Sequence, residues 1–141
     1  VDLCMNQELK PMVNQIEIHP FFQQKEALRV MEDYDVVPQA WGPLSEAQKH
    51  IFHHKTLAMI ADRHGKTTAQ VILRWHFQRG IPTIPKTVHQ DRMAENLDIF
   101  DFELTEKEME SIAGMDIGHS EIIDHHCFCT ARQLNSVKIH G

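Results

Sequence analysis

The chain has 141 residues, enough for one hydrophobic core, and its composition is that of an ordinary globular domain. Acidic residues outnumber basic ones by 20 to 14, which excludes a broad cationic surface for nucleic acid or anionic lipid. No apolar run approaches the roughly 20 residues that a membrane helix needs, and the first residues lack the cationic start of a signal peptide.

The first part of the chain predicts two strands with a helix between them. Residues 12–18 alternate in polarity, which places Gln15 and the polar residues at every second position on one face of a strand. A helix is expected over residues 23–33, where apolar residues recur at intervals of three and four. Residues 36–41 form the second predicted strand, although Pro38 removes one donor from its ladder.

Two helices are expected in the middle of the chain. The first covers residues 55–64 and stops at Gly65, because glycine is favoured just after helix ends. The second opens at Thr67, and Gln70 stands three positions later, as in a capping box. It carries an apolar stripe and is expected to end near Gly80.

A third strand and two further helices complete the pattern. Residues 80–85 form the strand, and residues 91–99 form the helix that follows it. The last helix begins at Thr105, where Glu108 completes a second capping box, and it ends near Gly114. The remaining residues predict an irregular tail.

The alternation of strands and helices predicts a parallel sheet with helical crossovers, hence an α/β protein. A doubly wound nucleotide-binding fold normally carries a glycine-rich turn after its first strand, whereas the six glycines of this chain are scattered singly. Three strand–helix units are too few for a closed eight-stranded barrel, which takes about 250 residues. The pattern therefore favours one part of such a barrel.

In parallel α/β folds, functional residues collect at the carboxyl ends of strands. Lys86 and Thr87 follow the third predicted strand, where Thr87 can cap the next helix with Gln90 as the partner in a capping box. Unpaired backbone N–H groups at the start of that helix would then form an anion site, to which Lys86 adds a full charge.

The same helix carries a polar face and an apolar face. Arg92, Glu95 and Asn96 share one side, while Met93 and Leu97 are expected to turn toward the core. A guanidinium can bind a phosphate through paired donors, and the other two side chains could hydrogen-bond an adenine or a ribose. A solvated helix face with ordinary charges is the alternative explanation.

Two other strand ends carry side chains that suit a planar cofactor. Trp41 ends the second predicted strand, where its ring could stack on a cofactor or pack in the core. Gln15 could bind a carboxamide or be satisfied by its neighbours. His19 could touch substrate or be an ordinary polar residue at a strand end.

Four segments, VNQIEIHPFFQQKEAL, AWGPL, TTAQVILRWHFQRG and IPTIPKTVHQDRMAENLDIFDFELTEKEM, resemble the second half of an aldo-keto reductase. The nearer resemblance is to bacterial diketogluconate-reductase-like members, up to about Met115. It implies the carboxyl-terminal part of a (β/α)8 TIM barrel, with about three βα units and an extra helix. Residues 1–117 would be half of the barrel, and residues 118–141 a tail near the active-site mouth.

The resemblance implies that this family reduces aldehydes and ketones with NADPH and carries no metal. Gln15 would hold the nicotinamide carboxamide, with Asn14 beside it. Trp41 would stack on the nicotinamide, and Leu44 would lie under the pyrophosphate. Gly42 stands where a serine is frequent, so one hydroxyl contact would be missing.

The adenosine end of the coenzyme would lie beside the last strand–helix unit. Lys86, Thr87 and Arg92 would hold the 2′-phosphate, which favours NADP over NAD. Glu95 and Asn96 would contact the adenine. These contacts, like those of the nicotinamide end, are implied by the resemblance.

The family's catalytic Asp, Tyr, Lys and His would come from the first half of the barrel. The only tyrosine here, Tyr34, precedes the second predicted strand and so lies at its amino end. We therefore expect the parent protein to reduce small carbonyl compounds and this chain alone to be inactive. The alternative is a truncated, non-catalytic remnant that binds nucleotide or serves as an assembly surface. The unpaired edges of an incomplete barrel predict self-association.

The three cysteines do not predict a disulfide framework, and they suit a reducing, cytoplasmic setting. The chain begins with Val1 instead of methionine, as a processed or partial chain would. In the tail, hydrophobic residues could line the active-site mouth or pack on outer helices: Ile122, Ile123 and Phe128. Four nearby residues are spaced poorly for zinc, so no metal is expected: His125, His126, Cys127 and Cys129.

Overall fold

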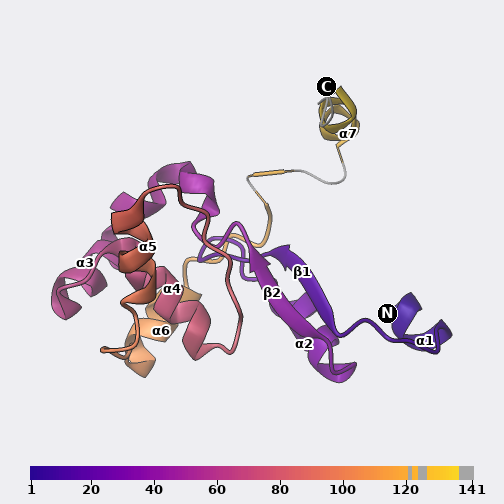
Figure 1. Cartoon of the computed structure of the whole chain (residues 1–141), viewed down its shortest axis with the longest axis horizontal. Helices are drawn as coiled ribbons and strands as arrows, with labels where there is room; N and C mark the ends of the chain where they lie inside the picture. The colour runs from indigo at the N-terminus through magenta and orange to yellow at the C-terminus, as the bar shows by residue number, and fades with distance from the viewer. Residues whose placement is uncertain (121, 124–126, 137–141) are drawn as a thin grey trace.

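The computed structural model describes residues 1–120, 122–123 and 127–136. Two strands and the helix between them, α2, lie beside a group of helices, α3 to α6 (Figure 1). The elements in chain order are α1 (Asp2–Asn6), β1 (Val13–Glu17), α2 (Lys25–Asp33), β2 (Val37–Trp41), the 3-10 helix η1 (Ser45–His53), α3 (Lys55–His64), α4 (Thr68–Gln78), α5 (Gln90–Leu97), α6 (Glu106–Ala113) and α7 (Phe128–Ser136).

The strands β1 and β2 pair in parallel, as the alternation of elements predicts, in a register that joins Val13 to Val37 and Glu17 to Trp41. The predicted strand over residues 80–85 is wrong: within the described residues it makes only an isolated parallel bridge between Ala40 and Thr83. Two prolines in that segment lack an N–H, so it offers little to a ladder. Its one backbone bond to β2 runs from the Ala40 N–H to the Pro82 carbonyl, over 2.8 Å.

Local capping signals predict two helix starts correctly. Thr67 caps α4 and Thr105 caps α6, each in a complete capping box with Gln70 or Glu108 three positions later. Gly65 ends α3 in the left-handed conformation at a φ of 61°, which glycine adopts without steric cost. Three elements were not predicted: α1, η1 and α7, the last of which lies in the tail expected to be irregular.

The main hydrophobic core lies between the strands and helices α3, α4 and α6. Ile18, Ala40, Ile72 and Trp75 are all buried there. Helices α4 and α3 contribute three buried residues each to this cluster: Val71, Ile72 and Trp75 from α4, and Leu57, Ile60 and Ala61 from α3. A second, smaller cluster joins α1 and α2 to the start of β2: Cys4, Met31 and Val36.

Candidate functional site

A cavity of about 610 Å³ lies beside the carboxyl end of β2, between η1, α3 and α5. Polar and apolar side chains both line it, as in many sites for small organic ligands. The loop after β2, the turn between α3 and α4, and the segment that leads into α5 all contribute. Six of the ten predicted cofactor residues line it: Leu44, Lys86, Thr87, Arg92, Glu95 and Asn96.

Lys86 and Arg92 supply positive charge at this cavity. Both side chains are exposed, and among the described residues neither forms an ion pair with a carboxylate. An exposed cation without a fixed partner remains available to an anionic ligand. Helix α5 adds its first N–H groups, since no side chain caps its start.

The predicted capping box at α5 is wrong. The helix begins at Gln90, with His89 as its N-cap residue and without a side-chain cap. The Thr87 hydroxyl instead accepts a hydrogen bond from the His89 N–H, over 3.1 Å, in a local turn. Thr87 therefore shapes the backbone ahead of the helix and leaves the first turn of α5 open.

Helix α5 is held in place by polar contacts with the start of α4. The Gln70 amide donates to the Asp98 carbonyl at 2.9 Å and to the Glu95 carbonyl at 3.2 Å, while the Thr67 hydroxyl donates to the Glu95 carboxylate at 2.5 Å. Lys66 donates to Asp98 at 2.8 Å and to Asp101 at 2.7 Å. The Asp101 and Asp98 hydrogen bonds raise the pKa of Lys66, and the Lys66 bond lowers the pKa of Asp101.

The expectation that Met93 and Leu97 turn toward the core is wrong. Met93 is 48% exposed and Leu97 is 71% exposed, and α5 buries no residue. The contacts of α5 with α4 are polar, so its apolar face has no partner among the described residues. The spacing of the apolar residues correctly places Met93 and Leu97 on one face of α5. It does not determine which segment, if any, covers that face.

A left-handed stretch of backbone forms the wall opposite α5. Ser45, Glu46 and Ala47 have positive φ values of 52°, 47° and 60°, at the start of η1. The left-handed conformation costs roughly 1–2 kcal/mol for each residue that carries a side chain. No glycine marks these positions in the sequence, which is why η1 was missed.

The other four predicted cofactor residues lie outside the lining of this cavity. Gln15 is exposed, and its amide donates to the Gln39 side chain of the neighbouring strand over 2.9 Å. Trp41 is half-buried at the end of β2, and Gly42 follows it with a φ of 56°. Asn14 points away from Gln15, into a separate cavity beside α2.

A buried polar cluster, the tail clasp (Glu17, His19 and Ser120), holds the start of the tail against the end of β1. The Glu17 carboxylate lies 2.9 Å from His19 Nε2 and accepts a hydrogen bond from the Ser120 hydroxyl at 2.6 Å. Ser120 Oγ also accepts the N–H groups of Ile122 and Ile123. Sequence reasoning placed Glu17 on the correct face, but nothing local pointed to Ser120 as its partner.

The tail clasp brings the tail close to the loop after β2. A Cβ on Gly42 would lie 3.4 Å from Ile122 Cδ1, an ordinary contact distance, so the tail packs against this loop. The His19 ring is 1% exposed, with Nε2 beside Glu17, and its Nδ1 has no partner among the described residues. These contacts favour a structural role for His19 over contact with substrate.

Tyr34 lies where the sequence predicts, before the amino end of β2. It follows α2 and packs on the small cluster that contains Met31 and Val36. Its hydroxyl is therefore at the opposite end of the strand from Trp41. Within the described residues, no helix has both the length and the apolar character to cross a lipid bilayer.

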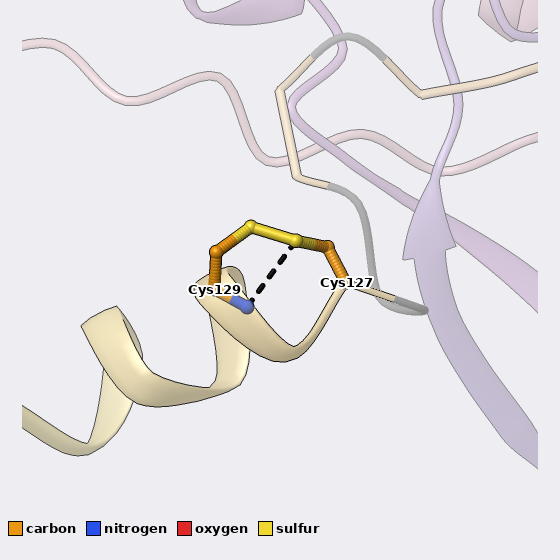
Figure 2. Close-up of a disulfide and its surroundings, with 2 residues drawn as sticks. All are labelled: Cys127 and Cys129. Carbon is orange, nitrogen blue, oxygen red and sulfur yellow. Dashed lines mark hydrogen bonds between the residues drawn. A yellow bond between two sulfur atoms is a disulfide. The ribbon is translucent and has the colours of Figure 1, made fainter.

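Cys127 and Cys129 form a disulfide, which the sequence analysis did not predict (Figure 2). Their Cα atoms are 5.2 Å apart, within the range that a disulfide spans, although only one residue separates them. The described residues contain no group of three His, Cys, Asp or Glu side chains arranged for a metal. His125 and His126 lie outside the described residues.

Comparisons with known proteins relate the chain to one family. A sequence profile of the Aldo/keto reductase family matches residues 3–117. The chain is 43% identical over 115 residues to glyoxal reductase of Bacillus subtilis (strain 168), a match that covers 82% of this chain and 41% of that protein. It is 40% identical over 108 residues to methylglyoxal reductase DkgA of Escherichia coli (strain K12), covering 77% and 39%. The chain thus spans about two fifths of the length of these relatives.

Solved structures show the same similarity in the backbone. MGS-M4, an aldo-keto reductase enzyme from a Medee basin deep-sea metagenome library, matches with a TM-score of 0.80 and 33% identity, covering 87% of this chain and 47% of that one. A mutant of Gox0644 in complex with NADPH matches with a TM-score of 0.79 and 35% identity, covering 94% and 45%. Each match extends over part of a larger fold.

Proposed function

Because this chain belongs to the aldo/keto reductase family, we propose that it forms the NADP(H)-binding part of a reductase that converts aldehydes and ketones to alcohols. Members of the family are (β/α)8 barrels, and in this proposal the chain would form the carboxyl-terminal part of one. The observation that carries the proposal is the pair of exposed cations, Lys86 and Arg92, beside one cavity and one uncapped helix start.

The residues around the cavity fit the adenosine end of NADP(H). Lys86 and Arg92 would bind the 2′-phosphate, because neither charge is neutralised by a neighbouring carboxylate among the described residues. Thr87 offers a hydroxyl next to them. Asn96 and the Glu95 carboxylate line the same cavity and would contact the adenine, with Glu95 already oriented by Thr67.

The end of the strand pair would bind the nicotinamide end of the coenzyme, which supplies the hydride when bound. The Gln15 amide would bind the carboxamide, since its second N–H and its carbonyl oxygen are not used by Gln39. Asn14 lies beside Gln15 in sequence but lines a separate cavity beside α2, so in this structure it would not reach the carboxamide. Trp41 would stack on the ring, and Leu44 would support the pyrophosphate from the cavity wall.

Within the described residues we assign no donor for the proton that completes carbonyl reduction. The single tyrosine lies at the amino end of β2, away from the proposed nicotinamide site. We propose that the catalytic Asp, Tyr, Lys and His belong to the first half of a complete reductase. A non-catalytic nucleotide-binding or assembly module is the second candidate, favoured by the exposed apolar residues Met12 and Val13 at the start of β1.

Coenzyme titration of the purified chain tests the proposal. We expect NADPH to change tryptophan fluorescence and to bind more tightly than NADH, because only NADPH carries the 2′-phosphate. We expect no aldehyde-dependent oxidation of NADPH by this chain alone. Unchanged fluorescence with both coenzymes, confirmed by calorimetry, would refute the coenzyme site, and clear turnover would refute the assignment of the acid to another part of the protein.

A further inference from the structure

The disulfide between Cys127 and Cys129 lies at a point of the fold that needs no covalent support. The bridge closes a loop around a single residue, Phe128, whose side chain is 81% exposed. Helix α7, which starts there, contributes no residue to either hydrophobic cluster and lies apart from α2 to α6 (Figure 1). The third cysteine, Cys4, is free and is buried near the other end of the chain.

Such a short loop gives little stability to the fold. In the chain-entropy account, a disulfide stabilises a protein by restricting the unfolded chain, and the effect shrinks with the length of the closed loop. Exposed bridges of this kind are more often labile than structural. The position of the bridge therefore favours a chemical role over a structural one.

The start of α7 stabilises a thiolate at Cys127. Cys127 directly precedes the helix, and its sulfur accepts the Cys129 N–H over 3.2 Å, as the dashed line in Figure 2 shows. Its carbonyl oxygen accepts the N–H groups of Thr130 and Ala131, which form the first turn. Helix N-termini lower the free energy of a thiolate through backbone N–H groups that reach the sulfur, here that of Cys129, and through the positive end of the helix dipole.

We propose that Cys127 and Cys129 form a reversible thiol–disulfide exchange site for thiols of the glutathione class. An incoming thiolate attacks Sγ of Cys129, which is the more exposed of the two residues, and forms a mixed disulfide. The Cys127 sulfur leaves with the electron pair of the broken bond, stabilised by the Cys129 N–H. A second thiolate then attacks the small-molecule sulfur and releases Cys129.

The balance of this exchange is two electrons and two protons. Two small thiols become one small disulfide, and the protein pair becomes two thiols. The reverse reaction needs only an oxidised disulfide of the same class. The pair lies outside the proposed coenzyme cavity, so the exchange does not depend on the proposed function.

Mass spectrometry of the full chain tests the site. The folded protein is equilibrated in buffers with different ratios of reduced to oxidised glutathione. Free thiols are then alkylated with N-ethylmaleimide, and the intact mass is measured. We expect two alkylation sites to be lost together as the buffer becomes oxidising, and to return together on reduction. Cys4→Ser serves as the matched control and should keep this paired transition.

Single variants test the direction of attack. In Cys127→Ser, which lacks the departing sulfur, we expect the glutathione adduct on Cys129 to persist, whereas it is transient in the unaltered protein. Fragment mapping of the adduct at limiting glutathione should place it on Cys129. The proposal is overturned if both thiols stay alkylatable in excess oxidised glutathione, if the bridge resists excess reduced glutathione in the folded protein, or if adducts map to Cys127.

Discussion

Arg92 and Lys86 are the residues on which coenzyme preference should depend. Both are exposed beside the same cavity, and neither contributes to the hydrophobic core. Their exposed positions beside one cavity could be expected from sequence, because both residues follow closely after the same apolar segment. The hydrogen bond of Thr87 was harder to predict, because two backbone N–H groups lie within reach of its hydroxyl. The hydroxyl accepts the N–H of His89.

Replacing Arg92 should weaken NADPH far more than NADH. A charge-assisted hydrogen bond contributes about 1.5–3 kcal/mol, so we expect Arg92→Ala to weaken NADPH by about 10- to 100-fold. NADH lacks the phosphate and should change little. Arg29→Ala, on the exposed side of α2, is the matched control. Calorimetric titration measures both coenzymes, and equal losses for the two would contradict the assignment.

His76 is a buried residue whose protonation opposes folding. Burial, the largest cause, lowers its pKa from 6.5 to about 4, and the charges of Arg79 and His19 act in the same direction. Its Nδ1 lies 2.8 Å from the Ile72 carbonyl oxygen and its Nε2 lies 3.0 Å from that of Ile18. These two acceptors favour the protonated ring and only partly offset the cost of burial.

Stability should therefore fall as the solution is acidified. The unfolded chain binds a proton at His76 below pH 6.5, whereas the folded protein binds it only near pH 4. The free energy of unfolding is therefore unaffected by protonation of His76 above about pH 6.5. It falls as the pH drops toward 4, by at most about 3 kcal/mol. Urea unfolding at a series of pH values measures it. His76→Gln, which cannot titrate, should flatten the profile, and an unchanged slope would contradict the assignment.

At the scale of elements, local signals predicted helices better than strands. The capping boxes of Thr67 and Thr105 are complete within four residues, so the sequence alone specifies them. The prediction of a strand over residues 80–85 was wrong because a strand needs a ladder of backbone hydrogen bonds, and the two prolines lack the N–H donors for it. The tail clasp joins Glu17 to Ser120 across 103 positions, a separation that no local pattern reveals.

Ser120→Ala should release the start of the tail. The Ile122 and Ile123 N–H groups both donate to Ser120 Oγ, so their hydrogen exchange should become faster without the hydroxyl. Glu17 would also lose a partner at 2.6 Å, and a buried carboxylate is costly without its hydrogen bonds. Exchange measured by mass spectrometry tests this expectation. Ser111→Ala is the control, because that hydroxyl bonds only within α6.

At the scale of the whole molecule, exposed apolar residues mark two surfaces without a partner among the described residues, one at β1 and one at α5. Met12 and Val13 are 79% and 52% exposed at the start of β1, whose outer edge is unpaired within the described residues. Val88 and Leu97 are 80% and 71% exposed around α5. Sequence patterns identified these residues as apolar but could not say whether another segment covers them. Open strand edges and apolar surfaces of this kind promote association.

The purified chain should consequently self-associate. We expect light scattering to give a mass above that of a monomer, rising with concentration. Val13→Lys should reduce the association, because a charge at an open edge opposes strand pairing. Met59→Lys is the control, since Met59 is 48% exposed on α3, away from that edge. A sharp monomer peak at all concentrations would contradict this prediction.

The strand register also makes the fluorescence of Trp41 a probe of the end of β2. Trp41 stands directly across from Glu17, so its indole occupies the position next to the carboxylate that fastens Ser120. Trp75, the second indole, is 1% exposed and insulated from solvent by the core. The fluorescence of Trp41 would therefore report on the proposed nicotinamide site, the buried Trp75 would supply a shielded reference signal, and no dye needs to be attached.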